Sequence, residues 1–91
     1  MKGQCWLCGK SGPTERHHIF GGALRQKSER YGLVLDLCHM CHNEPPEGVH
    51  FNAANMQFLH KEGQRMAMRE NGWSAEDFRR EFYKNYLDEE A

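Results

Sequence analysis

The sequence lacks any long apolar segment. Its 91 residues contain no run close to the roughly 20 apolar residues that a membrane-spanning helix needs. The N-terminal segment has no apolar stretch of signal-peptide length, and the chain shows no internal repeat or low-complexity tract. These absences argue against a membrane protein, an exported protein and a repeat array. They predict one domain, residues 1–91, located in the cytoplasm.

The chain is also short of material for a hydrophobic core. A domain of this length buries only about 60% of its unfolded surface, so its stability is marginal without a further support. Disulfides, a structural metal or oligomerisation are the usual supports. A hydrophobic content of 38% and a charged content of 27% are nevertheless typical of a globular protein. We therefore expect a folded domain that depends on such a support.

Four cysteines form two Cys-x-x-Cys pairs, Cys5/Cys8 and Cys38/Cys41. In a reducing compartment two such pairs indicate a metal rather than disulfides. Zn²⁺ takes four thiolates in a tetrahedron, and the two-residue spacer lets both sulfurs of a pair converge. The pattern predicts one structural Zn²⁺ that contributes about 10 kcal/mol to folding.

Two alternatives stay open for these cysteines. His39 and His42 flank Cys41, and either could replace it, although Cys41 completes the symmetric pair and leaves His42 for other work. A redox motif or an iron centre is the other interpretation. A redox motif needs only one pair, and an iron or redox centre predicts visible absorbance.

Five of the six histidines fall in the first 50 residues: His17, His18, His39, His42 and His50. Imidazole is a general base near neutral pH and a good ligand for transition metals. Hydrolysis of a phosphodiester needs both a base and a cation. The cluster therefore indicates a second, chemical site in the cysteine-bearing half, with Glu15 and Asp36 as candidates to orient an imidazole.

Periodicity and breakers give a coarse α+β layout. We expect a short strand at 5–8 with a tight turn at 9–13, strands at 14–20 and 33–37, and a short helix or ordered loop at 23–31. The paired prolines at 45–46 interrupt any helix there. Asn52 or Asn55 should cap one helix, which runs to about Arg69 and is stopped by Asn71-Gly72, and Ser74 should cap a second one. The apolar stripe of the second helix would be Phe78, Phe82 and Tyr86.

The residues carry a resemblance. The order Cys5-x-x-Cys8, then Glu15-Arg16-His17-His18-Ile19-Phe20-Gly21-Gly22, then Leu37-Cys38-x-x-Cys41-His42, resembles the zinc-bound HNH (His-Me finger) endonucleases, in particular short phage and prophage proteins. The match runs from Cys5 to about Phe51. It implies a ββα-metal, treble-clef-like core over 1–51 with one structural zinc, followed by two helices in 52–91. It also implies DNA cleavage with Mg²⁺, Mn²⁺ or a similar ion, leaving 5′-phosphate and 3′-hydroxyl ends.

The resemblance also implies roles for individual histidines. His18 matches the general base, His17 and His42 match ligands of the catalytic ion, and His50 is a further metal or phosphate ligand. Leu33 stands where the family has an asparagine, so a backbone carbonyl or another residue would orient the base. Neighbouring residues on a regular strand point to opposite faces, so His17 and His18 can serve one site only if the strand ends or distorts there, as Gly21-Gly22 would allow. The roles of base and ligand within this pair could therefore be exchanged.

The charge distribution is compatible with a DNA partner. Residues 1–42 carry a net charge of +3 and residues 43–91 carry −4. The candidates for phosphate contacts in the basic half are Arg16, Arg25, Lys27 and Arg30. A phage recombination or packaging protein is a possible further partner. The alternative function is a non-catalytic zinc module, a degenerate HNH fold that binds nucleic acid or protein.

Overall fold

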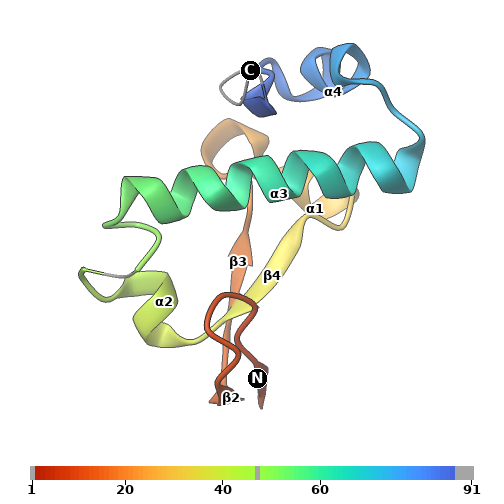
Figure 1. The fold of residues 1–91 in the computed structure, drawn as a ribbon. Helices are drawn as coiled ribbons and strands as arrows, with labels where there is room; N and C mark the ends of the chain where they lie inside the picture. The colour runs from red at the N-terminus through yellow and green to blue at the C-terminus, as the bar shows by residue number, and fades with distance from the viewer. Residues whose placement is uncertain (1, 47, 88–91) are drawn as a thin grey trace.

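In the computed structural model, which describes residues 2–46 and 48–87, two small antiparallel hairpins are followed and covered by helices (Figure 1). The fold is mixed α+β, as the sequence predicts. Its elements are β1 (Lys2–Gln4), β2 (Ser11–Pro13), β3 (Glu15–His18), a 3₁₀ turn (Gly22–Leu24), α1 (Arg25–Arg30), β4 (Val34–Leu37), α2 (His39–Asn43), α3 (Ala53–Asn71) and α4 (Ala75–Phe82).

The β3–β4 hairpin is the centre of the molecule. His17 lies opposite Leu35, His18 lies opposite Val34, and the ladder continues as the Ile19 N–H donates to the Leu33 carbonyl at 3.0 Å. Both strands fall within the predicted segments, with shorter bounds. The alternation leaves His17 buried and Arg16 exposed, so the two faces of β3 meet different surroundings.

Helix α1 is tied to the end of this hairpin by one buried hydroxyl. Ser28 Oγ accepts from the Phe20 N–H at 3.2 Å and donates to the Leu33 carbonyl at 2.5 Å. Because the side chain of Ser28 is fully buried, these bonds satisfy its hydroxyl and join α1 to residues next to both strands. The segment predicted as a short helix or ordered loop is thus a helix, held rigidly beside the strand that carries His17 and His18.

The ends of the two C-terminal helices follow the predicted signals. Asn52 caps α3 by accepting from the Asn55 N–H at 3.0 Å, and Gly72 ends it with a φ of +66°. Ser74 and Asp77 form a reciprocal capping box at the start of α4. The helix then ends at Phe82, because the next residue adopts a left-handed conformation.

Three local predictions are wrong. Residues 5–8 form a turn rather than a strand, closed by the Gly9 N–H donating to the Cys5 carbonyl at 2.9 Å, and 11–13 form β2 rather than a tight turn. A strand would send neighbouring side chains to opposite faces, whereas the turn brings Cys5 and Cys8 together. Tyr86 also lies beyond α4, although its ring still packs 5.3 Å from that of Phe20.

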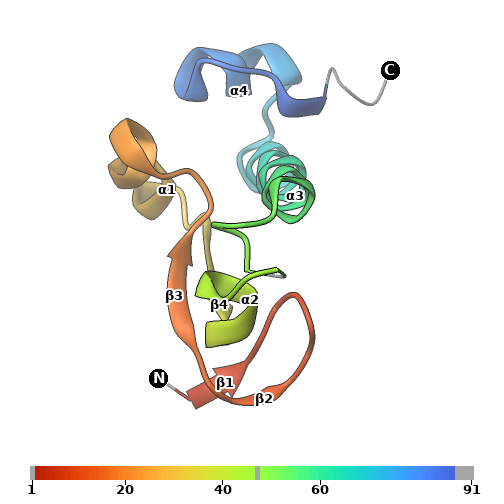
Figure 2. The same cartoon turned by 90° about the vertical axis from the view of Figure 1, so that its left-hand side faces the viewer.

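The core forms where α3 crosses the upper end of the hairpin. Figure 2 shows α1 and α3 on either side of that end, with α4 on the far side of α3 from β1 and β2. Phe20 is buried there, with ring centroids of Phe82 at 4.9 Å and Phe78 at 5.6 Å. In the described part of the chain, no helix is long and apolar enough to cross a membrane.

Close packing of α3 on the hairpin leads to a stability prediction for Gly63. A Cβ on this buried glycine would lie 2.6 Å from Ile19 Cγ2 and 3.1 Å from Phe20 Cε2. The Gly63→Ala variant gains about 1 kcal/mol of helix propensity, but overpacking a core costs about 1–3 kcal/mol. We expect a lower free energy of unfolding by urea titration. Gln57→Ala, on the exposed face of the same helix, should shift it by less than about 0.5 kcal/mol; a Gly63→Ala protein more stable than wild type would contradict the packing.

Candidate metal centres and the adjoining groove

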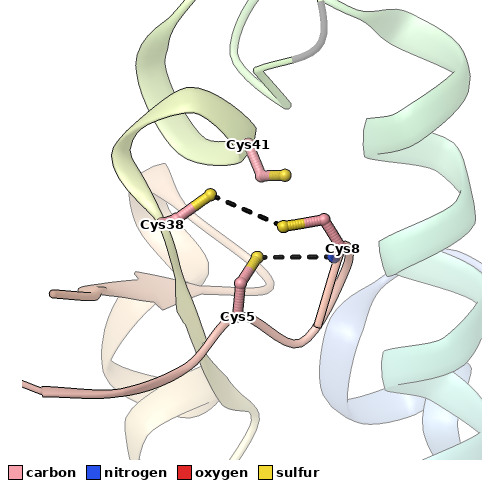
Figure 3. A group of neighbouring side chains, drawn as sticks. All are labelled: Cys5, Cys8, Cys38 and Cys41. Atoms are coloured by element: carbon pink, nitrogen blue, oxygen red, sulfur yellow. Dashed lines mark hydrogen bonds between the residues drawn. The ribbon is translucent and has the colours of Figure 1, made fainter. Parts of the chain in front are cut away.

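The four cysteines come together at the lower end of the molecule. Cys5 and Cys8 lie in the turn after β1, Cys38 follows β4 and Cys41 lies in α2, and their side chains point toward one another (Figure 3). All four are free thiols whose sulfurs lie within 4.8 Å of one another. The Cys8 and Cys38 sulfurs are 3.8 Å apart, and a tetrahedron with 2.3 Å Zn–S bonds requires about 3.8 Å. The cluster could hold a metal ion such as zinc.

Electrostatics in the cysteine cluster also suit a cation. Burial alone would raise the pKa of Cys5, but hydrogen bonds from the backbone N–H groups of Cys8, Cys38 and Leu7 lower it to about 6. Burial and the neighbouring sulfurs instead raise the pKa of Cys41 strongly. Without a counter-charge one thiolate therefore suppresses the ionisation of its neighbours, and a bound dication removes that repulsion.

A second cluster consists of three histidines from separate elements. His17 comes from β3, His42 from α2, and His50 from the segment before α3. One ring nitrogen of each lies within 4.8 Å of those of the other two. The ring centroids are 5.1 Å apart for His17–His42, 5.4 Å for His17–His50 and 4.8 Å for His42–His50. We call these residues the histidine trio.

The orientation of the trio's rings leaves nitrogen atoms for a ligand. Among the described residues, His17 Nε2 is buried and has no hydrogen-bond partner. Glu15 holds His42 through Nδ1 at 2.9 Å, and His42 Nε2 lies 3.1 Å from His50 Nε2. Two imidazole nitrogens on one ion at 2.0–2.1 Å would be about 3.0–3.4 Å apart. The trio therefore fits a metal ion, and the buried Nε2 lacks any other partner.

Burial keeps two of these imidazoles neutral. It lowers the pKa of His17 to about 4, with smaller contributions from His42 and His50, and it also lowers the pKa of His50. A metal binds neutral imidazole. The buried ring is thus already in its ligating form at neutral pH.

His18 lies outside the trio. Its Nε2 is 2.6 Å from Glu29 Oε2 on α1, and Arg16 donates to the other oxygen of the same carboxylate. Two hollows meet at this imidazole. The first, here the basic groove, is an open depression lined by Arg16, His18, Arg25, Gln26 and Glu29. The second, here the histidine hollow, is lined by His17, His18, Ile19, Gly21, His50, Met56 and His60.

The basic candidates divide into two kinds. Arg16 and Arg25 line the basic groove, and Arg30 is exposed on α1. Lys27 instead fixes α1 to the C-terminal segment. Its Nζ donates to the Glu81 carbonyl at 2.7 Å and lies 4.9 Å from the centre of the Tyr83 ring. Sequence reasoning could not separate Lys27 from Arg25 and Arg30, because the three residues lie on one polar segment.

His39 and His42, which flank Cys41, make hydrogen bonds to carboxylates outside the cysteine cluster. The two ring nitrogens of His39 lie 2.9 Å from Glu15 and 2.7 Å from Glu44, so the sulfur of Cys41, rather than His39 or His42, completes the cluster. Glu15 is thus an orienting residue. The Asp36 backbone carbonyl instead accepts from the Trp6 N–H at 2.9 Å. Sequence reasoning missed Glu29. An acidic residue eleven positions after a histidine is no recognisable signal of a contact between the two.

Comparisons with known proteins leave the site to be judged on its geometry. No family model matches the chain, and no curated protein or solved structure matches it significantly.

The cysteine cluster leads to a prediction about metal and folding. Purified protein should hold zinc, and the cobalt-substituted form should show thiolate-to-cobalt absorption. Cys8→Ala should lose that absorption and its helical circular dichroism, because three thiolates hold the ion poorly and the small core depends on it. Cys8 is exposed, so the substitution removes little packing. Ser11→Ala, exposed in the same hairpin, is the control; a folded, cobalt-free Cys8→Ala protein would refute the structural role.

Proposed function

We propose that the chain is a metal-dependent endonuclease of the HNH type, which hydrolyses phosphodiester bonds of DNA. The observation that carries this proposal is the convergence of His17, His42 and His50 next to His18. The His18 ring lies where the histidine hollow, next to the trio, meets the basic groove, which Arg16 and Arg25 line.

The local fold supports the proposal. The antiparallel pair β3–β4, which has the 3₁₀ turn and α1 inserted between its strands, is followed directly by the short helix α2. Apart from this insertion, the order of elements is the ββα order that the proposal requires. The hairpin supplies His17 and the helix supplies His42, while Cys38 and Cys41 bracket the junction between them. A structural zinc at the four cysteines would therefore fix the helix that positions one ligand of the catalytic ion.

The trio favours a particular class of ion. Imidazole nitrogens suit Ni²⁺, Zn²⁺ and similar transition ions, whereas Mg²⁺ prefers oxygen ligands. When bound, such an ion would neutralise charge on the scissile phosphate and on the leaving oxygen. We assign His17 and His42 as its ligands, and His50, which is exposed, as the third.

His18 is the residue that we propose as the general base. Its Nε2 is bound to Glu29, so Nδ1 is the nitrogen that would accept a proton from the attacking water. Arg16 and Arg25 line the groove on one side of this ring and would hold the phosphates of the substrate. Attack by the water breaks the bond to the 3′ oxygen and leaves a 5′ phosphate and a 3′ hydroxyl.

A plasmid-nicking assay tests this function. Zinc-loaded wild-type protein with Mn²⁺ or Ni²⁺ should convert supercoiled DNA to the nicked form, and His18→Ala should lower the rate by about 10²–10⁴-fold. His39→Ala removes a neighbouring histidine outside the trio and should keep the wild-type rate within about threefold. Equal nicking by the His18→Ala protein would indicate a contaminant or a different base. No nicking of duplex, single-stranded or branched DNA would favour the non-catalytic zinc module.

Metal titration tests the trio separately from activity. Calorimetry on zinc-loaded protein should show one further site for Ni²⁺ or Mn²⁺ and much weaker binding of Mg²⁺. His42→Ala should abolish that site but leave the cysteine-bound zinc in place, because only a partly buried ring is removed. His39→Ala again serves as control. Retention of the second site in the His42→Ala protein would remove the trio from the proposed mechanism.

A further inference from the structure

The contact between His18 and Glu29 joins strand β3 to helix α1. Glu29 lies in α1, the helix inserted between β3 and β4, and its carboxylate Oε2 is 2.6 Å from His18 Nε2. Arg16, which precedes the histidines on β3, donates to Oε1 of the same carboxylate. Ser28, the residue before Glu29, is buried and bonded to the ends of both strands. The carboxylate is therefore held from both sides and carried on a fixed backbone.

Contacts with His18 and Arg16 keep this carboxylate charged. The hydrogen bond with His18, and then the charge of Arg16, lower the pKa of Glu29 below its usual value. A charged carboxylate only accepts hydrogen bonds. The neutral His18 ring that satisfies it carries its proton on Nε2, which leaves the Nδ1 lone pair outward of the contact.

We propose that Glu29 is the positioning residue of the site, which selects the Nε2–H tautomer of His18 and sets its ring for proton abstraction at Nδ1. This inference rests on the proposed function for its catalytic meaning, although the tautomer itself does not. Glu29 takes over the orienting task for which the chain has only Leu33, a fully buried apolar residue. Its carboxylate contacts His18 and Arg16, and we assign it a role that acts through His18.

Three variants separate positioning from general effects. Glu29→Ala removes the acceptor, and Glu29→Gln keeps an acceptor oxygen but loses the charge. Glu76→Ala breaks a comparable exposed carboxylate–arginine pair, Glu76–Arg79 on α4, and serves as control. Glu29 is itself only half-buried, so all three proteins should fold, which circular dichroism verifies.

The kinetic expectation is a loss in kcat that exceeds any change in KM, since Glu29 also holds Arg16 of the basic groove. Removal of a residue that orients a functional imidazole typically costs about 10–100-fold, and we expect this for Glu29→Ala. Glu29→Gln should recover most of it, to within about fivefold of wild type, because a neutral hydrogen bond is about half as strong as a charge-assisted one. Glu76→Ala should match wild type. A Glu29→Ala protein with wild-type kcat would overturn the proposal while leaving the nuclease itself intact.

A spectroscopic measurement tests the tautomer without any activity. Long-range ¹H–¹⁵N correlation spectra of zinc-loaded protein, recorded at alkaline pH, should show His18 as the Nε2–H form in wild type. Glu29→Ala should shift it toward a mixture of both forms, and Glu76→Ala should not. An Nδ1–H ring in wild type, or an unchanged ring in Glu29→Ala, would overturn the proposal. If wild type fails to cleave DNA, this result still decides whether Glu29 controls the ring.

Discussion

Four sulfurs from two segments lie within 4.8 Å of one another, in a domain whose small core needs a further support. The first pair lies in the turn after β1, and the second pair lies at the start of α2 and within it, a helix of five residues. Neither a turn nor so short a helix is stable alone. A shared cation would hold both against β4, and the same helix carries His42 four residues after Cys38. Folding and the proposed chemistry thus depend on one set of thiolates.

Strand β3 directs its two adjacent histidines, His17 and His18, toward different partners. Because pairing stays regular through Ile19, His17 turns toward α2 and joins the trio, and His18 turns toward α1 and meets Glu29. The alternation of side chains along β3 made a single site shared by His17 and His18 doubtful. It instead places the two histidines in two neighbouring sites. The two hollows meet at His18. A base at such a boundary can face a phosphate in the groove while the ion is held on the other side.

Short-range chemistry was predictable, and long-range contacts were not. The Cys-x-x-Cys spacing, the caps at Asn52 and Ser74 and the break at Gly72 are local signals, and each appears in the structure. The turn at 5–8 was missed because strand propensity ignores the demand that both thiols face one point. Glu29 was missed because its contact exists only when α1 folds back on β3. Lys27 was misplaced for the same reason, since its partner Glu81 is 54 residues away.

The two clusters differ in a way that bears on their roles. The cysteine cluster offers four protein ligands, which fill a tetrahedron and leave no position for a substrate. The trio offers three, at the edge of a hollow, with His50 exposed. A three-ligand site keeps positions for water or a phosphate oxygen, which is the arrangement of catalytic metals. A merely structural role for the trio would leave unexplained why a marginal core buries His17 Nε2 without a partner among the described residues, at a cost of about 1–3 kcal/mol. A ligand for that nitrogen offsets the cost, and so the buried histidine argues for a metal in the second site.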